Sequence, residues 1–110
     1  MPKFEDLKPV PKRVKAQRHI ELIAEIGSNA NGDFDRAKNL VSVACSCGAD
    51  TIKAQLFTAD TLWRKDHSRY VDTLKVETKP KWIPELKKIV EGHGKEFLCT
   101  PFSLSAVDTL

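Results

Sequence analysis

The sequence lacks several features that would assign it quickly to a class. No run approaches the about 20 apolar residues of a membrane span, and the amino terminus has no apolar core of a secretory signal. Cysteines are few and odd in number (Cys45, Cys47 and Cys99), and their spacing fits neither a disulfide framework nor a metal site. These absences argue against a membrane-spanning or disulfide-stapled protein. They favour reduced thiols packed in a core, in a cytoplasmic protein.

Two kinds of ligand site are also missing. The three histidines (His19, His67 and His93) are far apart and show no metal-ligand spacing, so we expect no metal site made by this chain alone. No glycine pattern of a dinucleotide-binding fold or a P-loop follows the first strand-like segment. Internal repeats and low-complexity segments are absent as well. The chain therefore does not predict a nucleotide-binding or repeat protein.

The charge of the chain is ordinary except at its start. The net charge is +3 and 30% of residues are charged. Residues 1–18 hold six basic side chains against Glu5 and Asp6, include three prolines and lack helical periodicity. We interpret this segment as a solvated basic arm rather than as a nucleic-acid or membrane contact. The folded segment is then predicted to comprise residues 19–110.

The rest of the sequence alternates strand-like and helix-like segments. Strands are predicted over residues 20–26, 50–56 and 96–100, with helices from the N-cap Asp33 to about Cys47 and around Pro84. The apolar stripe of the first helix is predicted to comprise Ala37, Leu40, Val41, Ala44 and Cys47. A long connection with a local helix around Ser68 to Leu74 runs from Thr58 to about Thr78, and Ser103 or Ser105 is a candidate cap for a last helix. Such alternation predicts an α/β fold with parallel strands and right-handed crossovers. Three parallel strands with two or three helices cannot cover both sheet faces or pair both edges, which predicts the opening portion of a longer α/β protein rather than a chain completed by association.

Polar residues interrupt each of the three strands near its carboxyl end. Glu25 lies in the first strand, Lys53 and Gln55 in the second, and Thr100 precedes Pro101 in the third. A strand buried on both faces should be apolar throughout, so these side chains are costly unless they are solvated, paired or functional. Ligands of α/β sheets and barrels bind at this end of the strands. The pattern predicts an active-site rim.

Several chemical roles remain open for these residues. Glu25 suits a general acid or base or a hydrogen-bonding anchor, but also a structural carboxylate paired with a cation. Lys53 suits pairing with Glu25 on the neighbouring strand, binding of a substrate carboxylate or phosphate, or Schiff-base chemistry. Gln55 lies on the same strand face as Lys53 and offers a donor and an acceptor to a hydroxylated ligand.

At these same residues the chain resembles the sialic acid synthase family, which comprises N-acetylneuraminate, legionaminate and pseudaminate synthases and the animal 9-phosphate synthases. The resemblance extends over residues 20–110. The matching segments are Ile23–Gly27, Asn29–Asp33, Ala37–Leu40, Gly48–Gln55, Phe97–Phe102 and Ala106–Asp108.

This resemblance implies the amino-terminal portion, about three β/α units, of a TIM (β/α)₈ barrel, truncated before the remaining barrel and a C-terminal antifreeze-like domain. It implies a transferase of carbohydrate biosynthesis that condenses phosphoenolpyruvate with an N-acylated amino sugar and releases phosphate. It further implies a homodimer in the full-length protein. A divalent metal, Mn²⁺ or Mg²⁺, would be needed, with ligands outside this chain.

The resemblance also assigns roles to residues. Glu25 and Lys53 correspond to catalytic positions, Lys53 and Thr100 to phosphoenolpyruvate-binding positions, and Gln55 and Asn31 to the sugar or its loop. The loop departs from the usual family pattern Asn-His-Asn-Gly because Ala30 stands at the histidine position.

We expect the isolated chain to have little or no activity, because the metal site and the sugar lid that the resemblance implies are missing from it. The sequence leaves two alternatives to the synthase function open. One is a Schiff-base barrel lyase or aldolase that uses Lys53, and the other is a non-catalytic remnant or binding module.

Overall fold

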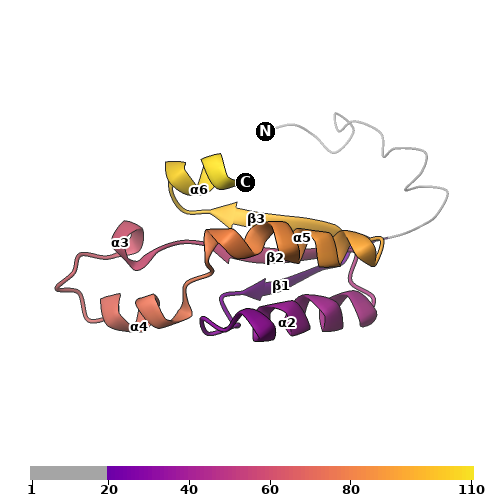
Figure 1. The fold of residues 1–110 in the computed structure, drawn as a ribbon, viewed down its shortest axis with the longest axis horizontal. Helices are drawn as coiled ribbons and strands as arrows, with labels where there is room; N and C mark the ends of the chain where they lie inside the picture. The colour runs from indigo at the N-terminus through magenta and orange to yellow at the C-terminus, as the bar shows by residue number, and fades with distance from the viewer. Residues whose placement is uncertain (1–19) are drawn as a thin grey trace, which may run out of the picture.

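A computed structural model describes residues 20–110 of the chain; the predicted arm at 1–18 and His19 lie outside the described residues. Parallel strands alternate with helices along the chain (Figure 1). In chain order the elements are β1 (Ile23–Gly27), α2 (Phe34–Ser46), β2 (Thr51–Leu56), α3 (Ala59–Leu62), α4 (Tyr70–Val76), the 3₁₀ turn η2 (Pro80–Trp82), α5 (Ile83–Gly92), β3 (Glu96–Pro101) and α6 (Leu104–Thr109). The predicted order of strands and helices is confirmed.

The strands form a sheet in the order β1-β2-β3, with every pairing parallel. Residues Glu25 and Lys53 are register partners between β1 and β2, and Gln55 and Thr100 are partners between β2 and β3. The register of β1 shifts by one residue between Glu25 and Gly27. The carboxyl ends of all three strands therefore meet at one edge of the sheet.

Helices α2 and α5 cover one face of this sheet and form the core with it (Figure 1). Helix α2 begins where the Asp33 side chain accepts a hydrogen bond from the Arg36 amide at 3.1 Å, as the N-cap pattern predicts. Its apolar stripe buries Val41 fully, against Ile52 of β2 and Leu86 of α5. Burial of this apolar surface drives the packing of the helices onto the sheet.

The prediction that Cys47 belongs to the apolar stripe of α2 is wrong. Cys47 is exposed and caps the carboxyl end of the helix, whereas Cys45 is buried in the core. The stripe pattern of Ala37 and Val41 continues to Cys45 at four-residue intervals, and Cys47 lies on the other side of the helix.

The opposite face of the sheet carries no helix among the residues that the structure describes. Ile23 of β1 is 49% exposed there and Leu98 of β3 is 44% exposed. Strand alternation places Glu25, Lys53 and Thr100 on this same open face. Helices thus cover one face of the sheet only within residues 20–110, and the side chains of Glu25, Lys53 and Thr100 remain partly solvated.

The segment between β2 and η2, residues 57–79, is called the excursion below. It contains α3 and α4, and Figure 1 shows both helices beyond the carboxyl ends of the strands. The sequence predicted one long connection here with a local helix around Ser68 to Leu74, and α4 confirms that helix. No helix in the described part of the chain is long and apolar enough to span a membrane.

The three thiols differ in environment, which predicts different reactivity. Burial raises the pKa of Cys99 to about 11, with a smaller contribution from the negative charge of Glu25, and burial also raises the pKa of Cys45. Because the thiolate is the nucleophile, both thiols are largely protonated at pH 8, and Cys47, which is exposed, should react first.

Alkylation with iodoacetamide at pH 8, followed by peptide mass mapping, tests this order. We expect Cys99 to react at least about tenfold more slowly than Cys47, and its rate to rise as the pH approaches 11. Equal rates at the three thiols in the native chain, with denatured chain as the control, would contradict the prediction.

Candidate active site

The centre of the candidate site is an ion pair between neighbouring strands. Lys53 Nζ of β2 lies 3.6 Å from Glu25 Oε2 of β1, and the two side chains are 35% and 44% exposed. The pair forms because the parallel register sets these residues opposite each other on the open sheet face. Because both ends are partly solvated, the pair leaves each charge accessible to a ligand.

The side-chain amide of Gln55 lies near the Glu25 carboxylate, beside Gly27. A Cβ atom at Gly27 would lie 3.5 Å from Glu25 Oε1 and 3.6 Å from Gln55 Oε1, so both oxygens converge on this backbone point. Gly27 has a positive φ of 54°, a conformation that glycine adopts without strain where β1 turns into its loop. The carboxylate, ammonium and amide therefore form one group.

Thr100 joins this group through the register of β3. It is the partner of Gln55 across the β2–β3 pairing and is half-buried. Strand alternation places it on the same sheet face as Lys53 and Gln55. Four of the five residues predicted from the sequence are thus gathered at the carboxyl end of the sheet.

Asn31 is the fifth, and the structure does not bring it into this group. It is exposed in the loop of residues 27–33, with φ of 53°, and within residues 20–110 its side chain makes no hydrogen bond. Its neighbour Ala30, where the resemblance led us to expect a histidine, is buried and packs in the core cluster. Ala30 therefore anchors the loop instead of facing the strand-end group.

The group offers defined chemistry. A lysine ammonium binds a phosphate or carboxylate as a point charge, and a carboxylate can accept or donate a proton at a reacting centre. Gln55 and Thr100 add hydrogen-bonding groups for a polar ligand. Within the described residues no set of three or more His, Cys, Asp and Glu side chains is arranged to hold a metal ion.

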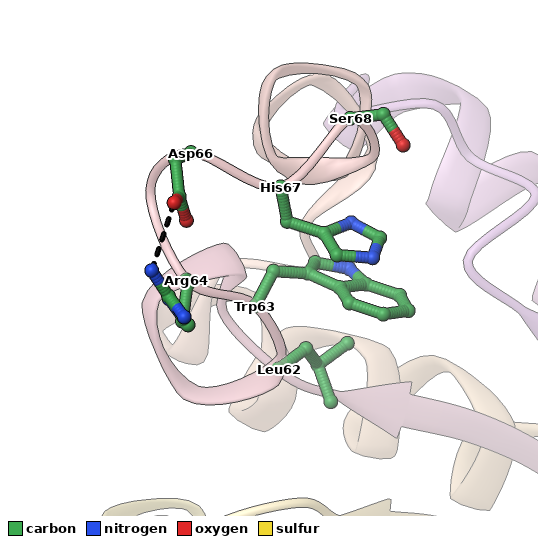
Figure 2. Close-up of a pocket in the computed structure, with 6 residues that line it drawn as sticks. All are labelled: Leu62, Trp63, Arg64, Asp66, His67 and Ser68. Atoms are coloured by element: carbon green, nitrogen blue, oxygen red, sulfur yellow. Dashed lines mark hydrogen bonds and ion pairs between the residues drawn. The ribbon is translucent and has the colours of Figure 1, made fainter.

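A separate hollow lies in the excursion, at Leu62 to Ser68 (Figure 2). Figure 2 shows the His67 imidazole lying over the Trp63 indole, with ring centroids 4.3 Å apart. Arg64 and Asp66 form an ion pair of 2.9 Å at its rim. None of the residues predicted from the sequence lines this hollow, which is open and formed by a single short segment.

One buried charged residue was missed by the sequence reasoning. Glu77 is 8% exposed, accepts a hydrogen bond of 2.7 Å from the Ala59 amide, and lies 3.2 Å from Lys79 Nζ. No local pattern around Glu77 distinguishes it from a solvated loop carboxylate. Its burial depends on a partner that is 18 residues away.

Comparison with known proteins identifies the chain's relatives. A model of the NeuB family matches residues 40–110. An uncharacterized protein of Methanocaldococcus jannaschii is 43% identical over 91 residues, which cover 81% of this chain and 26% of that protein. N,N'-diacetyllegionaminic acid synthase of Campylobacter jejuni is 33% identical over 103 residues, which cover 81% of this chain and 31% of the synthase.

Solved structures agree with the predicted fold. The chain superposes on an N-acetylneuraminic acid synthetase from Leptospira borgpetersenii with a TM-score of 0.77 at 24% identity, covering 83% of this chain and 32% of that chain. A spore coat polysaccharide biosynthesis protein of Bacillus subtilis gives a TM-score of 0.61 at 32% identity, covering 81% of this chain and 25% of that chain. The predicted fold class, the first three β/α units of a TIM barrel, is confirmed.

The chain spans between 26% and 31% of the length of these curated relatives. The matches also confirm the resemblance that the sequence motifs indicated.

Proposed function

Because the chain belongs to the NeuB family, we propose that it supplies the first three β/α units of an enzyme that condenses phosphoenolpyruvate with an N-acylated amino sugar. The product is a nonulosonic, sialic-type acid, and phosphate is released. Relatives named as legionaminic acid synthases, which match 81% of the chain, support this substrate class.

The observation that carries the proposal is the Glu25–Lys53 pair on the open sheet face, with Gln55 beside it. Barrel enzymes bind their substrates at the carboxyl ends of the strands and fill the rest of the barrel with apolar side chains. The open face of the sheet likewise carries both kinds of side chain: the apolar residues Ile23 and Leu98 lie beside the polar group. Further strands of a complete barrel would cover this face.

We assign the anion of phosphoenolpyruvate to Lys53 and Thr100. A trianionic substrate needs a fixed cation, and the Lys53 ammonium is accessible from the open face. Thr100 lies one strand away, across from Gln55, where its hydroxyl can donate to a phosphate or carboxylate oxygen.

We assign the proton and the sugar to the remaining residues. In the reaction the enol carbon forms a bond to the sugar aldehyde carbon, whose oxygen gains a proton. Water then adds at the carbon that carries the phosphate, and phosphate leaves by cleavage of the bond between that carbon and the bridging oxygen. Glu25 is the group that moves a proton at this centre, Gln55 binds sugar hydroxyls, and Asn31 contributes from the loop.

A Schiff-base reaction at Lys53 is less well supported. Lysine nucleophiles are activated by desolvation or by a neighbouring cation. Lys53 is 35% exposed, and its ionic partner within residues 20–110 is the Glu25 carboxylate. Treatment with borohydride and pyruvate separates the two reactions, because only a Schiff base becomes covalently fixed. We expect no adduct on Lys53.

The proposal is tested in a chimera of the Campylobacter jejuni synthase in which residues 20–110 of this chain replace the matching segment. We expect phosphate release from phosphoenolpyruvate in the presence of Mn²⁺ and an N-acyl amino sugar. The 110-residue chain by itself should release none. A folded chimera that is inactive with a panel of N-acyl sugars, while the parent synthase is active, would overturn the proposal.

A further inference from the structure

Glu77 links the two ends of the excursion. Its Oε1 accepts a 2.7 Å hydrogen bond from the Ala59 amide at the start of α3, and its Oε2 lies 3.2 Å from Lys79 Nζ. Glu77 is 8% exposed, and both of its carboxylate oxygens have a partner. Its hydrogen bond to the Ala59 amide joins residues that are 18 positions apart along the chain, near the two ends of the excursion. Removing this carboxylate would leave the Ala59 amide without its partner.

Side-chain contacts inside the excursion then set where α4 lies. Trp63 Nε1 donates to Thr73 Oγ1 at 2.9 Å, and Tyr70 Oη donates to Asp60 Oδ1 at 2.7 Å. Each bond joins the α3 side of the excursion to α4. Together with the hydrogen bond between Glu77 and the Ala59 amide, these bonds tie α4 to the segment that follows β2.

The end of α4 meets the loop of residues 27–33. A Cβ atom at Gly32 would collide with the backbone carbonyl oxygen of Lys75, in the last turn of α4, and Gly32 has a φ of 76° that favours glycine. The loop itself is a series of turns, in which Asn31 N donates to Ser28 O at 3.2 Å. Its other end is Gly27, against which Glu25 and Gln55 converge.

We infer that Glu77 is a positioning residue for the candidate site: by linking the two ends of the excursion it holds α4 against Gly32, and so fixes the loop of residues 27–33, whose first residue, Gly27, lies against Glu25 and Gln55. Glu77 touches none of these residues and acts through the backbone contact between Lys75 and Gly32. The mechanical part of this inference rests on the geometry alone. Only its consequence for sugar binding rests on the proposed function.

Hydrogen exchange of the 110-residue chain tests the mechanical part. We expect Glu77→Ala to speed exchange of the Asn31 and Asp33 amides at least about tenfold, while the amides of α5 keep their protection. Glu77→Gln should restore most of the protection, because it retains an oxygen that accepts from the Ala59 amide. The matched control is Glu91→Ala, which removes an exposed carboxylate 3.7 Å from Lys87 and should change nothing in the loop.

Two results would overturn the inference. One is faster exchange in the excursion with an unchanged loop in Glu77→Ala, and the other is a loop without protection in the unaltered chain. If Glu77→Ala also loses the protection of α5, Thr73→Val decides, since it removes the hydrogen bond from Trp63 to α4 without altering the loop itself. Faster loop exchange in Thr73→Val supports the inference, and an unchanged loop refutes it.

Kinetics in the chimera test the consequence. We expect Glu77→Ala to raise KM for the N-acyl sugar about tenfold with little change in kcat, and Glu77→Gln to reverse this. Loss of the loop protection together with an inactive chimera would refute the proposed function but leave the positioning role standing. Loop protection unaffected in an active chimera would refute the positioning role alone.

Discussion

Lys53→Met should reduce phosphate release by the chimera about 1,000-fold, in line with the loss of one fixed electrostatic contact to a transition state. Methionine is unbranched like lysine and one atom shorter, so it keeps most of the apolar stem but has no charge for the phosphoenolpyruvate anion. Glu25 would lose its partner at 3.6 Å, yet its side chain is 44% exposed, so water solvates the carboxylate and the fold should persist. The effect should appear as a raised KM for phosphoenolpyruvate and a reduced kcat.

Lys87→Met is the matched control for this variant. Lys87 lies 3.7 Å from Glu91 on α5, an ion pair of almost the same length on the helix surface away from the sheet face. Exposed pairs of this kind contribute little, so phosphate release should stay within about twofold of the parent chimera. If Lys53→Met and Lys87→Met behaved alike, the anchoring role of Lys53 would be wrong.

Glu25→Gln should lower kcat by about 100-fold to 10,000-fold, because an amide of the same shape cannot take up or deliver a proton in the same way. KM for phosphoenolpyruvate should not rise. The substitution removes a negative charge from the neighbourhood of Lys53, so the ammonium is left free to bind the substrate anion. Steady-state kinetics at varied phosphoenolpyruvate and saturating sugar separate the two parameters.

Glu96→Gln provides the control on the same sheet face. Glu96 is exposed in β3 and is the register partner of Thr51, at the amino end of the sheet, whereas Glu25 pairs with Lys53 toward the carboxyl end. Active sites of barrels lie at the carboxyl end, so this variant should retain kcat. A kcat for Glu25→Gln close to that of Glu96→Gln would exclude Glu25 from proton transfer. If Glu25→Gln raised KM for phosphoenolpyruvate by as large a factor as it lowered kcat, the role of Glu25 would be to position Lys53.

Local patterns in the sequence determined the order of strands and helices and several of their ends. Asp33 and Ser103 cap helices because their side chains accept from amides three residues away, at Arg36 and Ala106. Such interactions lie within a few residues along the chain and are visible in the sequence. The polar residues Lys53 and Gln55 were recognisable for a similar reason, since they interrupt an otherwise apolar strand.

Tertiary structure alone decided which of these residues meet. The sequence left pairing of Lys53 with Glu25 as one of three alternatives, and the parallel register sets the two side chains 3.6 Å apart. The sequence also predicted that this portion cannot cover both faces of its sheet, but only the structure shows which face the helices cover within residues 20–110. Register and coverage depend on residues far apart in the chain, and no local pattern encodes them.

In the excursion too, local structure could be predicted from the sequence but long-range contacts could not. Its α4 helix was predictable in place, but the burial of Glu77 and the contact of Lys75 with Gly32 were not. Both arise from backbone groups of distant segments, whose hydrogen-bonding and steric demands are the same in any sequence. The sequence by itself thus determined the polar residues of the candidate site, and only the tertiary structure decided their distances and the supports around them.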